Sequence, residues 1–257
     1  MELLAHIRIV SWQGASLWLS DATRAKGPEP RRTDFHAHHA IQITIGLGGW
    51  FKLETAGSSM RGDAVAVSAD TPHVFEAEGL MAFLFVEPES RQGRSISQRF
   101  FRGGPLADLP SDTLGTFRDR VLASYHARTD DDAALARLGQ DLLAALSANT
   151  PADVPDLRIR KVIAWAAEQI DEPVSLSDAA AVSGLSASRL RHLFVEQTGL
   201  PFKTYLLWLR LTRAVECFAV GASLTEAAHE AGFSDSAHLS RTFRRMFGIA
   251  PASLRIV

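Results

Sequence analysis

The stretch AGFSDSAHLSRTFRRMFGIAP, residues 231–251, has the same layout as SGLSASRLRHLFVEQTGLPF, residues 183–202. The two copies are 48 residues apart at Gly184 and Gly232. Glycine adopts a positive φ at little cost and is often the residue that ends a helix. We therefore predict two helix pairs. In each pair a short helix ends at the glycine and a second helix follows.

Serine and threonine precede the helices of both copies and are favoured N-cap residues. The candidate openers are Ser175 or Ser177 and Ser186 in the first copy, and Ser223 or Thr225 and Ser234 in the second. Between the copies, residues 202–219 have a helical pattern, and 18 residues at about 1.5 Å each form a rod roughly 27 Å long. A rod of that length can hold the second helices of the two pairs about 34 Å apart, which is roughly one turn of DNA.

A helix-turn-helix presents the outer face of its second helix to base edges in the major groove. Arginine binds guanine bidentately, and serine and histidine are adaptable donors. The alternative is that both outer faces are ordinary solvated helix surfaces; the presence of two copies favours DNA binding. The candidate base-reading residues are Ser188, Arg189, Arg191 and His192, then Ser236, Ala237, His238, Ser240 and Arg241, with Lys203, Arg244 and Arg245 for phosphates.

Residues 155–255 resemble the DNA-binding domain of the AraC/XylS family of bacterial transcription regulators, in which one long helix joins two helix-turn-helix motifs. The residues of the second motif that carry the resemblance are Ala228, Gly232, Phe233, Phe243, Phe247, Gly248, Pro251 and Arg255. The first motif fits through residues 175–214, and Leu254 stands where the family usually has tyrosine. The resemblance implies double-stranded DNA as a partner, RNA polymerase as a further candidate partner, a homodimer, and no enzymatic activity.

The first half of the chain has a strand pattern. Short apolar runs at 41–47, 63–68 and 81–86 are separated by turn residues, which predicts an antiparallel barrel or sandwich. At 112–147 leucines recur every three or four residues, which predicts two amphipathic helices. Their leucine faces either form a dimer seam or pack on the barrel.

The proline-containing segment 147–156 marks a boundary. We therefore expect a two-domain α+β protein, with a cupin-like antiparallel β-barrel at 1–110, a helical linker at 111–150 and an all-α double helix-turn-helix domain at 155–257.

Four histidines fall in FHAHHAIQ and TPH. This pattern resembles the two motifs of the cupin barrel, which is the sensor domain of many AraC-type regulators. The resemblance implies that His36, His38, Gln42 and His73 converge inside the barrel. Gln42 stands where the metal-binding pattern has glutamate, and a neutral amide binds a divalent cation less strongly. On an extended strand His39 faces away from His38.

Three interpretations of the cluster stay open. Three imidazoles and an open position suffice for a zinc, iron or nickel ion at His36, His38 and His73. Alternatively, the polar groups orient an organic effector or satisfy one another at the barrel mouth, or the histidines lie on exposed loops without a role. The candidate effector site adds Trp50, Phe83 and Phe85 to His36, His38, Gln42 and His73, and further wall positions are Ile43, Ile45 and Met81; each apolar position is also compatible with plain core.

Charge and composition limit the classes of function that fit this sequence. Residues 186–257 hold nine basic and five acidic residues, a net charge of +4, whereas the whole chain has −2. This asymmetry favours a sensor joined to a polyanion-binding module. A single cysteine, and an apolar run of only seven residues at 80–86, indicate a reducing compartment, no membrane span and a cytoplasmic location. The alternatives are a metal-dependent cupin enzyme with a helical appendix, and a helical adaptor that binds protein.

Overall fold

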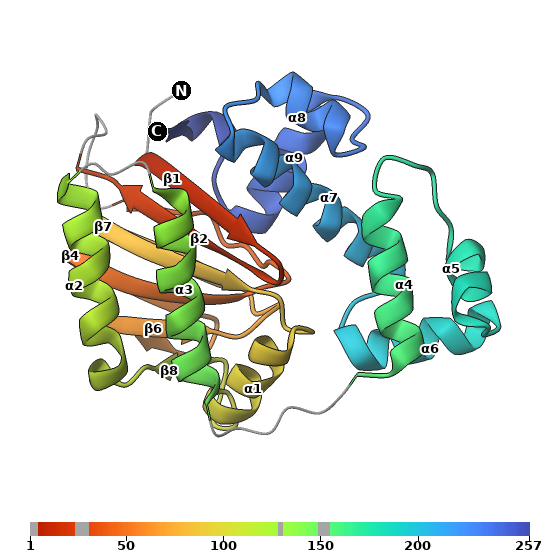
Figure 1. Ribbon diagram of the computed structural model, residues 1–257, viewed down its shortest axis with the longest axis horizontal. Helices are drawn as coiled ribbons and strands as arrows, with labels where there is room; N and C mark the ends of the chain where they lie inside the picture. Colours follow the sequence, from red (N-terminus) through yellow and green to blue (C-terminus); the bar gives the residue numbers. More distant parts are fainter. Residues whose placement is uncertain (1–4, 24–30, 128–130, 149–154) are drawn as a thin grey trace. The chain divides into compact units, whose positions relative to one another are not determined.

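The computed structural model contains two compact units (Figure 1). The first comprises Met1–Ala152 together with Phe243–Val257, and the second comprises Asp153–Thr242. The first unit is built on a sheet and the second is helical, so the expected two-part α+β class is confirmed. The structure describes residues 5–23, 31–127, 131–148 and 155–257. Within these ranges, no helix has both the length and the apolar character that crossing a membrane requires.

The sheet of the first unit rests on two long strands, β4 and β7, which pair along most of their length. Each is longer than the predicted run that it contains, 41–47 in β4 and 81–86 in β7, and β4 contains a register shift between Gly46 and Gly48. The strands of this unit are β1 (Ala5–Trp12), β2 (Ala15–Asp21), β3 (Arg31–Arg32), β4 (Ile41–Thr55), β5 (Ser59–Met60), β6 (Ala64–Val67), β7 (His73–Val86), β8 (Leu106–Asp108) and β9 (Leu254–Ile256).

The expectation of a closed barrel is wrong. The described strands follow the open order β8-β6-β4-β7-β2-β1-β9, and the two ends of this path do not pair with each other. The last strand comes from the C-terminus and runs parallel to β1, with Ala5 opposite Leu254. Alternating apolar residues predict strands, but closure depends on strand tilt and stagger, which the pattern does not carry.

Three helices accompany the sheet: α1 (Arg91–Phe100), α2 (Ser111–Ala127) and α3 (Asp132–Ser147). Helices α2 and α3 confirm the two predicted between 112 and 147, whereas α1 was not predicted. Helices α2 and α3 both contact one face of the sheet (Figure 1). Their apolar residues join the sheet in a single core, which favours packing over a dimer seam; these residues are Leu114, Phe117, Val121, Leu135, Leu138, Leu142, Leu143 and Leu146.

The helices of the second unit begin and end at identifiable residues. Ser175 and Ser223, rather than Ser177 and Thr225, form capping boxes with Asp178 and Glu226. Asp156 caps the first helix, so Pro155 lies just before the cap. The helices are α4 (Leu157–Glu168), α5 (Leu176–Ser183), α6 (Ala187–Thr198), α7 (Phe202–Ala219) and α8 (Leu224–Glu230), followed by the first residues of α9 (Ser236–Phe247).

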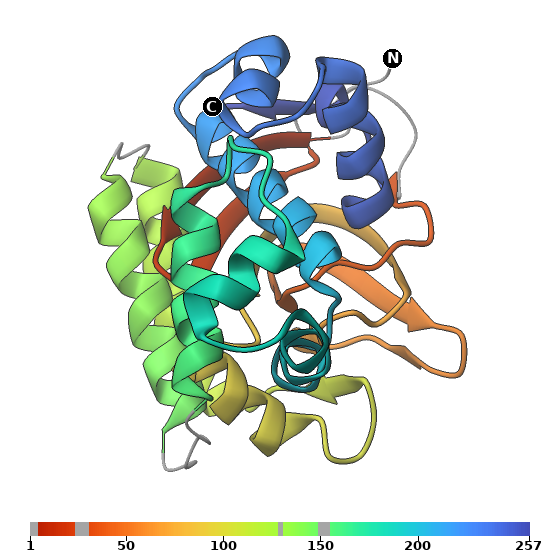
Figure 2. The ribbon, with the colours of Figure 1, turned by 90° about the vertical axis from the view of Figure 1, so that its right-hand side faces the viewer.

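Helix α7 spans the predicted residues 202–219 and contacts α4, α6 and α8 (Figure 2). Its Arg210 donates from Nε to the carbonyl oxygen of Ile170, at 2.9 Å, in the loop after α4. A Cβ at Gly232 would lie 2.6 Å from the same carbonyl oxygen. The turn of the second motif therefore packs closely on the loop between α4 and α5, and only glycine fits there.

Candidate functional site

Helix α6 presents the predicted reading face of the first motif. Gly184 has φ 68°, and Ser186 caps the new helix by accepting a hydrogen bond from the Arg189 N–H at 3.3 Å. On the inner side Leu190 and Phe194 are fully buried. The four predicted side chains on the outer side are exposed, namely Ser188, Arg189, Arg191 and His192.

Helix α9 is opened by Asp235 and not by Ser234. The Asp235 carboxylate accepts a hydrogen bond from the His238 N–H at 2.6 Å, and this bond lowers the pKa of Asp235. Ser234 instead lies 3.2 Å from the His238 ring. A carboxylate is the stronger partner at a helix N-terminus, because it also interacts with the helix dipole.

The side chains of α9 that are predicted to contact DNA differ in their exposure to solvent. Ala237 and Arg241 are exposed, whereas Ser236, His238 and Ser240 are half-buried. The Ser240 hydroxyl already donates to the carbonyl of Ser236 at 2.8 Å. The most accessible donor on this face is therefore Arg241.

The three predicted phosphate contacts also differ. Lys203 and Arg245 are exposed. Arg244 is exposed too, but it forms an ion pair with Asp34 in the first unit, with both its Nε and Nη2 2.8 Å from Oδ2. DNA would have to compete with Asp34 for Arg244.

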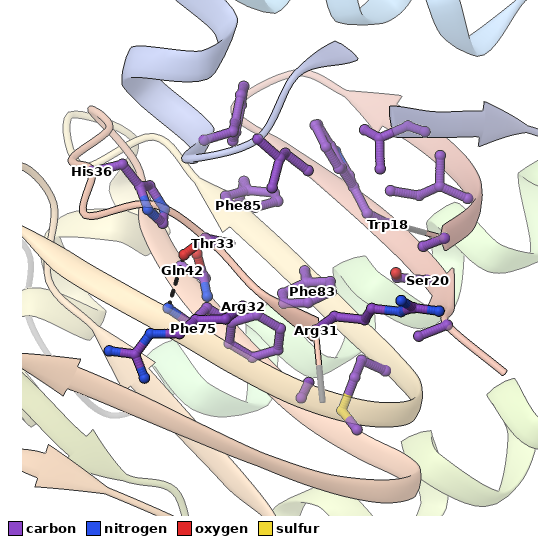
Figure 3. A pocket seen from close by; sticks show the side chains of 18 of the residues that line it. Trp18, Ser20, Arg31, Arg32, Thr33, His36, Gln42, Phe75, Phe83 and Phe85 are labelled. Carbon is purple, nitrogen blue, oxygen red and sulfur yellow. Dashed lines mark hydrogen bonds between the residues drawn. The ribbon is translucent and has the colours of Figure 1, made fainter. Parts of the chain in front are cut away.

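A cavity lies on the face of the sheet opposite to α2 and α3 (Figure 3). Its empty space, open mouth included, is about 780 Å³. Phe83, Phe85 and Trp18 contribute aromatic walls, with His36 at one end and Arg31 near Ser20 at the other (Figure 3). The remaining lining residues are Ala5, Ile7, Ala22, Arg32, Thr33, Gln42, Phe75, Ala77, Gly79, Met81, Phe247, Ile249 and Leu254.

The C-terminal segment 243–257 forms one side of this cavity. The Phe247 ring lies 5.1 Å from Trp18, 5.6 Å from Phe85 and 5.8 Å from His38, measured between ring centroids. The Gly248 carbonyl accepts a hydrogen bond from the Asp34 N–H at 2.8 Å. The end of α9 is thus part of the cavity wall.

Only some of the predicted effector-binding residues lie on the face of the sheet that lines the cavity. Gln42, Met81, Phe83 and Phe85 line the cavity together with His36. Ile43 and Ile45 point the other way, into the core formed with α2 and α3, because neighbouring residues on a strand face opposite sides of the sheet. Trp50 is also outside the cavity lining, and it donates to Glu78 at 3.1 Å beneath the Arg61 guanidinium.

The structure brings His36, His38 and His73 together. One ring nitrogen of each lies within 4.8 Å of the others, and all three side chains are buried. Burial is the main cause that lowers the pKa of all three imidazoles, and the neighbouring His73 adds to it for His36, whose pKa is about 4. The cluster is therefore held neutral.

His39 is separate from this cluster, as predicted, although residues 39–40 form a bend before β4 and not an extended strand. Its ring bridges Asp70 and Glu89, with each nitrogen 2.7 Å from a carboxylate oxygen. Burial lowers the pKa of His39, but the hydrogen bonds to the two carboxylates outweigh it and raise the pKa to about 9. His39 is a buried cation with a structural role.

Comparisons of sequence with known proteins concern the helical part of the chain, and comparisons of structure concern the fold of nearly the whole chain. Residues 179–256 match a helix-turn-helix domain. The chain is 36% identical over 101 residues to the HTH-type transcriptional activator RhaS of Enterobacter sp. (strain 638), and 35% identical over 99 residues to RhaS of Escherichia coli (strain SE11). These matches cover 39% and 38% of this chain and 36% of each activator. The names describe activators rather than enzymes, in agreement with the expectation that the chain is not an enzyme.

Over nearly the whole chain the fold is similar to that of ToxT from Vibrio cholerae O395. The TM-score is 0.59 at 12% identity, covering 93% of this chain and 95% of ToxT. At this identity the likeness shows the fold alone, and it includes the open sheet as well as the helices.

Sequence reasoning missed several cavity residues. Trp18 and Phe247 are 229 positions apart, and nothing in their local patterns relates them. Phe247 occupies a family motif position, which indicates helix packing but not a cavity. Arg31 follows residues 24–30, which the structure does not describe, and its isolated arginine pair carries no pattern.

Proposed function

We propose that this protein is a ligand-responsive, sequence-specific DNA-binding transcription regulator of the AraC type. Helices α6 and α9 would each place an exposed arginine, Arg191 or Arg241, in the major groove, and a small effector would bind in the sheet cavity. A homodimer in the cytoplasm, with RNA polymerase as a further partner, belongs to the same proposal. The enzyme and adaptor alternatives lack a specific supporting observation.

One observation carries the DNA-binding proposal. Two helices with exposed arginines follow glycine turns in the same way, and they lie in a segment that matches a helix-turn-helix domain. The two glycines, Gly184 and Gly232, both have φ 68°. A repeated reading device with basic outer faces suits adjacent grooves of one duplex.

The lining of the cavity supports a particular chemical class of effector. Its walls are mostly apolar and partly aromatic, and its few polar groups include Gln42, His36, Thr33 and the guanidinium of Arg31. Apolar walls with a few convergent polar groups are typical of small-molecule sites. A compact, partly aromatic or aliphatic molecule with at least one acceptor for Arg31 fits this chemistry.

The cavity wall suggests how an effector would reach the DNA-binding helix. Phe247 and Gly248 contribute to the wall and its support, and Arg244 lies one turn before them on α9. A molecule that displaces Phe247, or holds it in place, therefore changes whether Arg244 remains paired with Asp34. Differential contact of this kind is what allows a ligand to shift an equilibrium.

Selection of bound duplexes from a random DNA library tests the main proposal. We expect enrichment of one sequence with two blocks about 10 base pairs apart, corresponding to successive major grooves. Affinity for the selected duplex should fall steeply with salt, because phosphate contacts release counterions. Recovery of no preferred sequence, or affinity insensitive to salt, would overturn it.

A further inference from the structure

His36 and His73 face each other across two backbone hydrogen bonds. The His36 N–H donates to the His73 carbonyl at 3.0 Å, and the His73 N–H donates to the His36 carbonyl at 2.8 Å. Residues paired in this way carry their side chains on the same face. His38 is two residues beyond His36 and its ring joins the same group, 5.1 Å from the His73 ring. The backbone thus positions three imidazoles on one side.

Each ring has its Nδ1 fixed by a main-chain carbonyl. His36 Nδ1 lies 2.8 Å from the Asp34 oxygen, His38 Nδ1 3.1 Å from the Ala40 oxygen and His73 Nδ1 2.8 Å from the Thr71 oxygen. A carbonyl oxygen only accepts, so each Nδ1 must carry the hydrogen. In a neutral imidazole Nε2 is then the lone-pair nitrogen, which is the tautomer of a metal-binding histidine.

The Nε2 atom of His73 points to a missing ligand. His73 Nε2 is buried without a hydrogen-bond partner. His38 Nε2 lies 3.1 Å from the amide oxygen of Gln42, so a side-chain oxygen is also close to the three rings. A cation among the three rings gives the lone pair of His73 Nε2 a partner, and the ring nitrogens of His36 and His38 are close enough to join it. A buried polar atom without a partner is otherwise costly.

We propose that the imidazoles of His36, His38 and His73 bind one divalent transition-metal ion, with Zn²⁺ as the first candidate. Three neutral imidazoles without a thiolate suit Zn²⁺, Ni²⁺ or Co²⁺. The Gln42 amide oxygen or a cavity ligand beside His36 completes the coordination. Nitrogens around a tetrahedral Zn²⁺ are about 3.3 Å apart, so the rings draw together by up to about 1.5 Å on binding.

Wild-type protein without a polyhistidine tag, stripped with a chelator, provides the first measurement. We expect Zn²⁺ titrated into it to bind at one equivalent in calorimetry, and Co²⁺ to bind with visible d–d bands that Zn²⁺ abolishes. X-ray absorption of the Zn²⁺ form should show outer-shell scattering from three imidazoles. A wild-type protein that binds no Zn²⁺ or Co²⁺, or that shows fewer than three imidazoles, overturns the proposal without any variant.

Variants locate the site. His73→Ala and His36→Ala should each weaken Zn²⁺ binding by at least about tenfold, whereas His126→Ala and His229→Ala, at exposed positions on α2 and α8, should leave it unchanged. Unchanged binding in folded His73→Ala would place the metal elsewhere and overturn the assignment. If that variant does not fold, the imidazole count of the wild type decides. None of these measurements involves DNA, so the proposal stands or fails separately from the DNA-binding function.

Discussion

Arg244 and Asp34 form an ion pair across 210 positions of sequence, in which two guanidinium nitrogens lie 2.8 Å from the same carboxylate oxygen. Asp34 also donates its N–H to the carbonyl of Gly248. One residue of the His36 loop therefore holds both the side chain and the backbone at the end of α9. In this arrangement a basic residue of the second motif is occupied by the protein itself.

Replacing Asp34 by asparagine should free Arg244 for phosphate. Since an exposed ion pair contributes about 0.2–1 kcal/mol, DNA affinity should rise by up to about fivefold at low salt. Fluorescence anisotropy with a labelled duplex measures the change. Asp132→Asn, which breaks the exposed Arg8–Asp132 pair in the same unit, is the matched control and should have no effect. An unchanged or lower affinity for Asp34→Asn would argue against competition for Arg244.

Replacing Arg191 or Arg241 by alanine should affect specific binding most. Loss of a base-edge contact costs about 1–3 kcal/mol and relaxes the preference at one position of the site. Competition between the selected duplex and scrambled DNA separates this effect from general weakening. Arg160→Ala, an exposed position on α4, serves as the control. Equal loss on both DNAs would assign the two arginines to phosphates instead.

Two glycines allow a matched test of how closely the C-terminal segment 243–257 packs against the loop that contains Asp34 and His36. Gly184 and Gly248 have φ of 68° and 71°, so alanine is strained at either position. A Cβ at Gly184 meets nothing within 4 Å, whereas one at Gly248 would lie 2.5 Å from His36 Nδ1 and 2.6 Å from the Asp34 oxygen. Gly184→Ala should therefore destabilise the protein by about 1 kcal/mol.

Gly248→Ala should cost clearly more and increase hydrogen exchange in 33–36 and 243–250. Urea unfolding compares the two variants, and mass spectrometry locates the exchange. Equal destabilisation, with exchange unchanged around Gly248, would contradict the close packing described above.

His39 predicts a pH dependence of stability. Folding raises its pKa from 6.5 to about 9, so the folded protein keeps a proton that the unfolded chain releases between these values. The contribution is fully present below pH 6.5 and is lost as the pH rises toward 9. Its size is on the order of 3 kcal/mol at most.

Urea unfolding in EDTA at pH 6.5, 7.5 and 9 measures this slope for the wild type and for His39→Gln. The variant should be less stable at pH 6.5 and should lack the decline. Parallel slopes for the two proteins would mean that His39 does not bind the extra proton. The lowered pKa values of His36, His38 and His73 act mainly below pH 6.5 and are shared by the two proteins, so the comparison isolates His39.

The elements that depend on neighbouring residues were predictable. The turn at Gly184 and the helix at 202–219 follow from backbone freedom and periodicity, and Ser175 and Ser223 were each one of two predicted helix openers. The opener of α9 was predicted wrongly, because Ser234 and Asp235 are adjacent good caps and the helix geometry chooses between them.

By itself the sequence determined the two helix-turn-helix motifs, the long helix between them and three strand runs of the first unit, because these depend on interactions a few residues apart. It also placed His38 and His39 on opposite sides. Only the tertiary structure decided that the sheet stays open, that Ile43 faces the helices, and that Phe247 and Arg244 join the first unit. Those features depend on which distant segments come into contact, and periodicity along one segment carries no information about its partner.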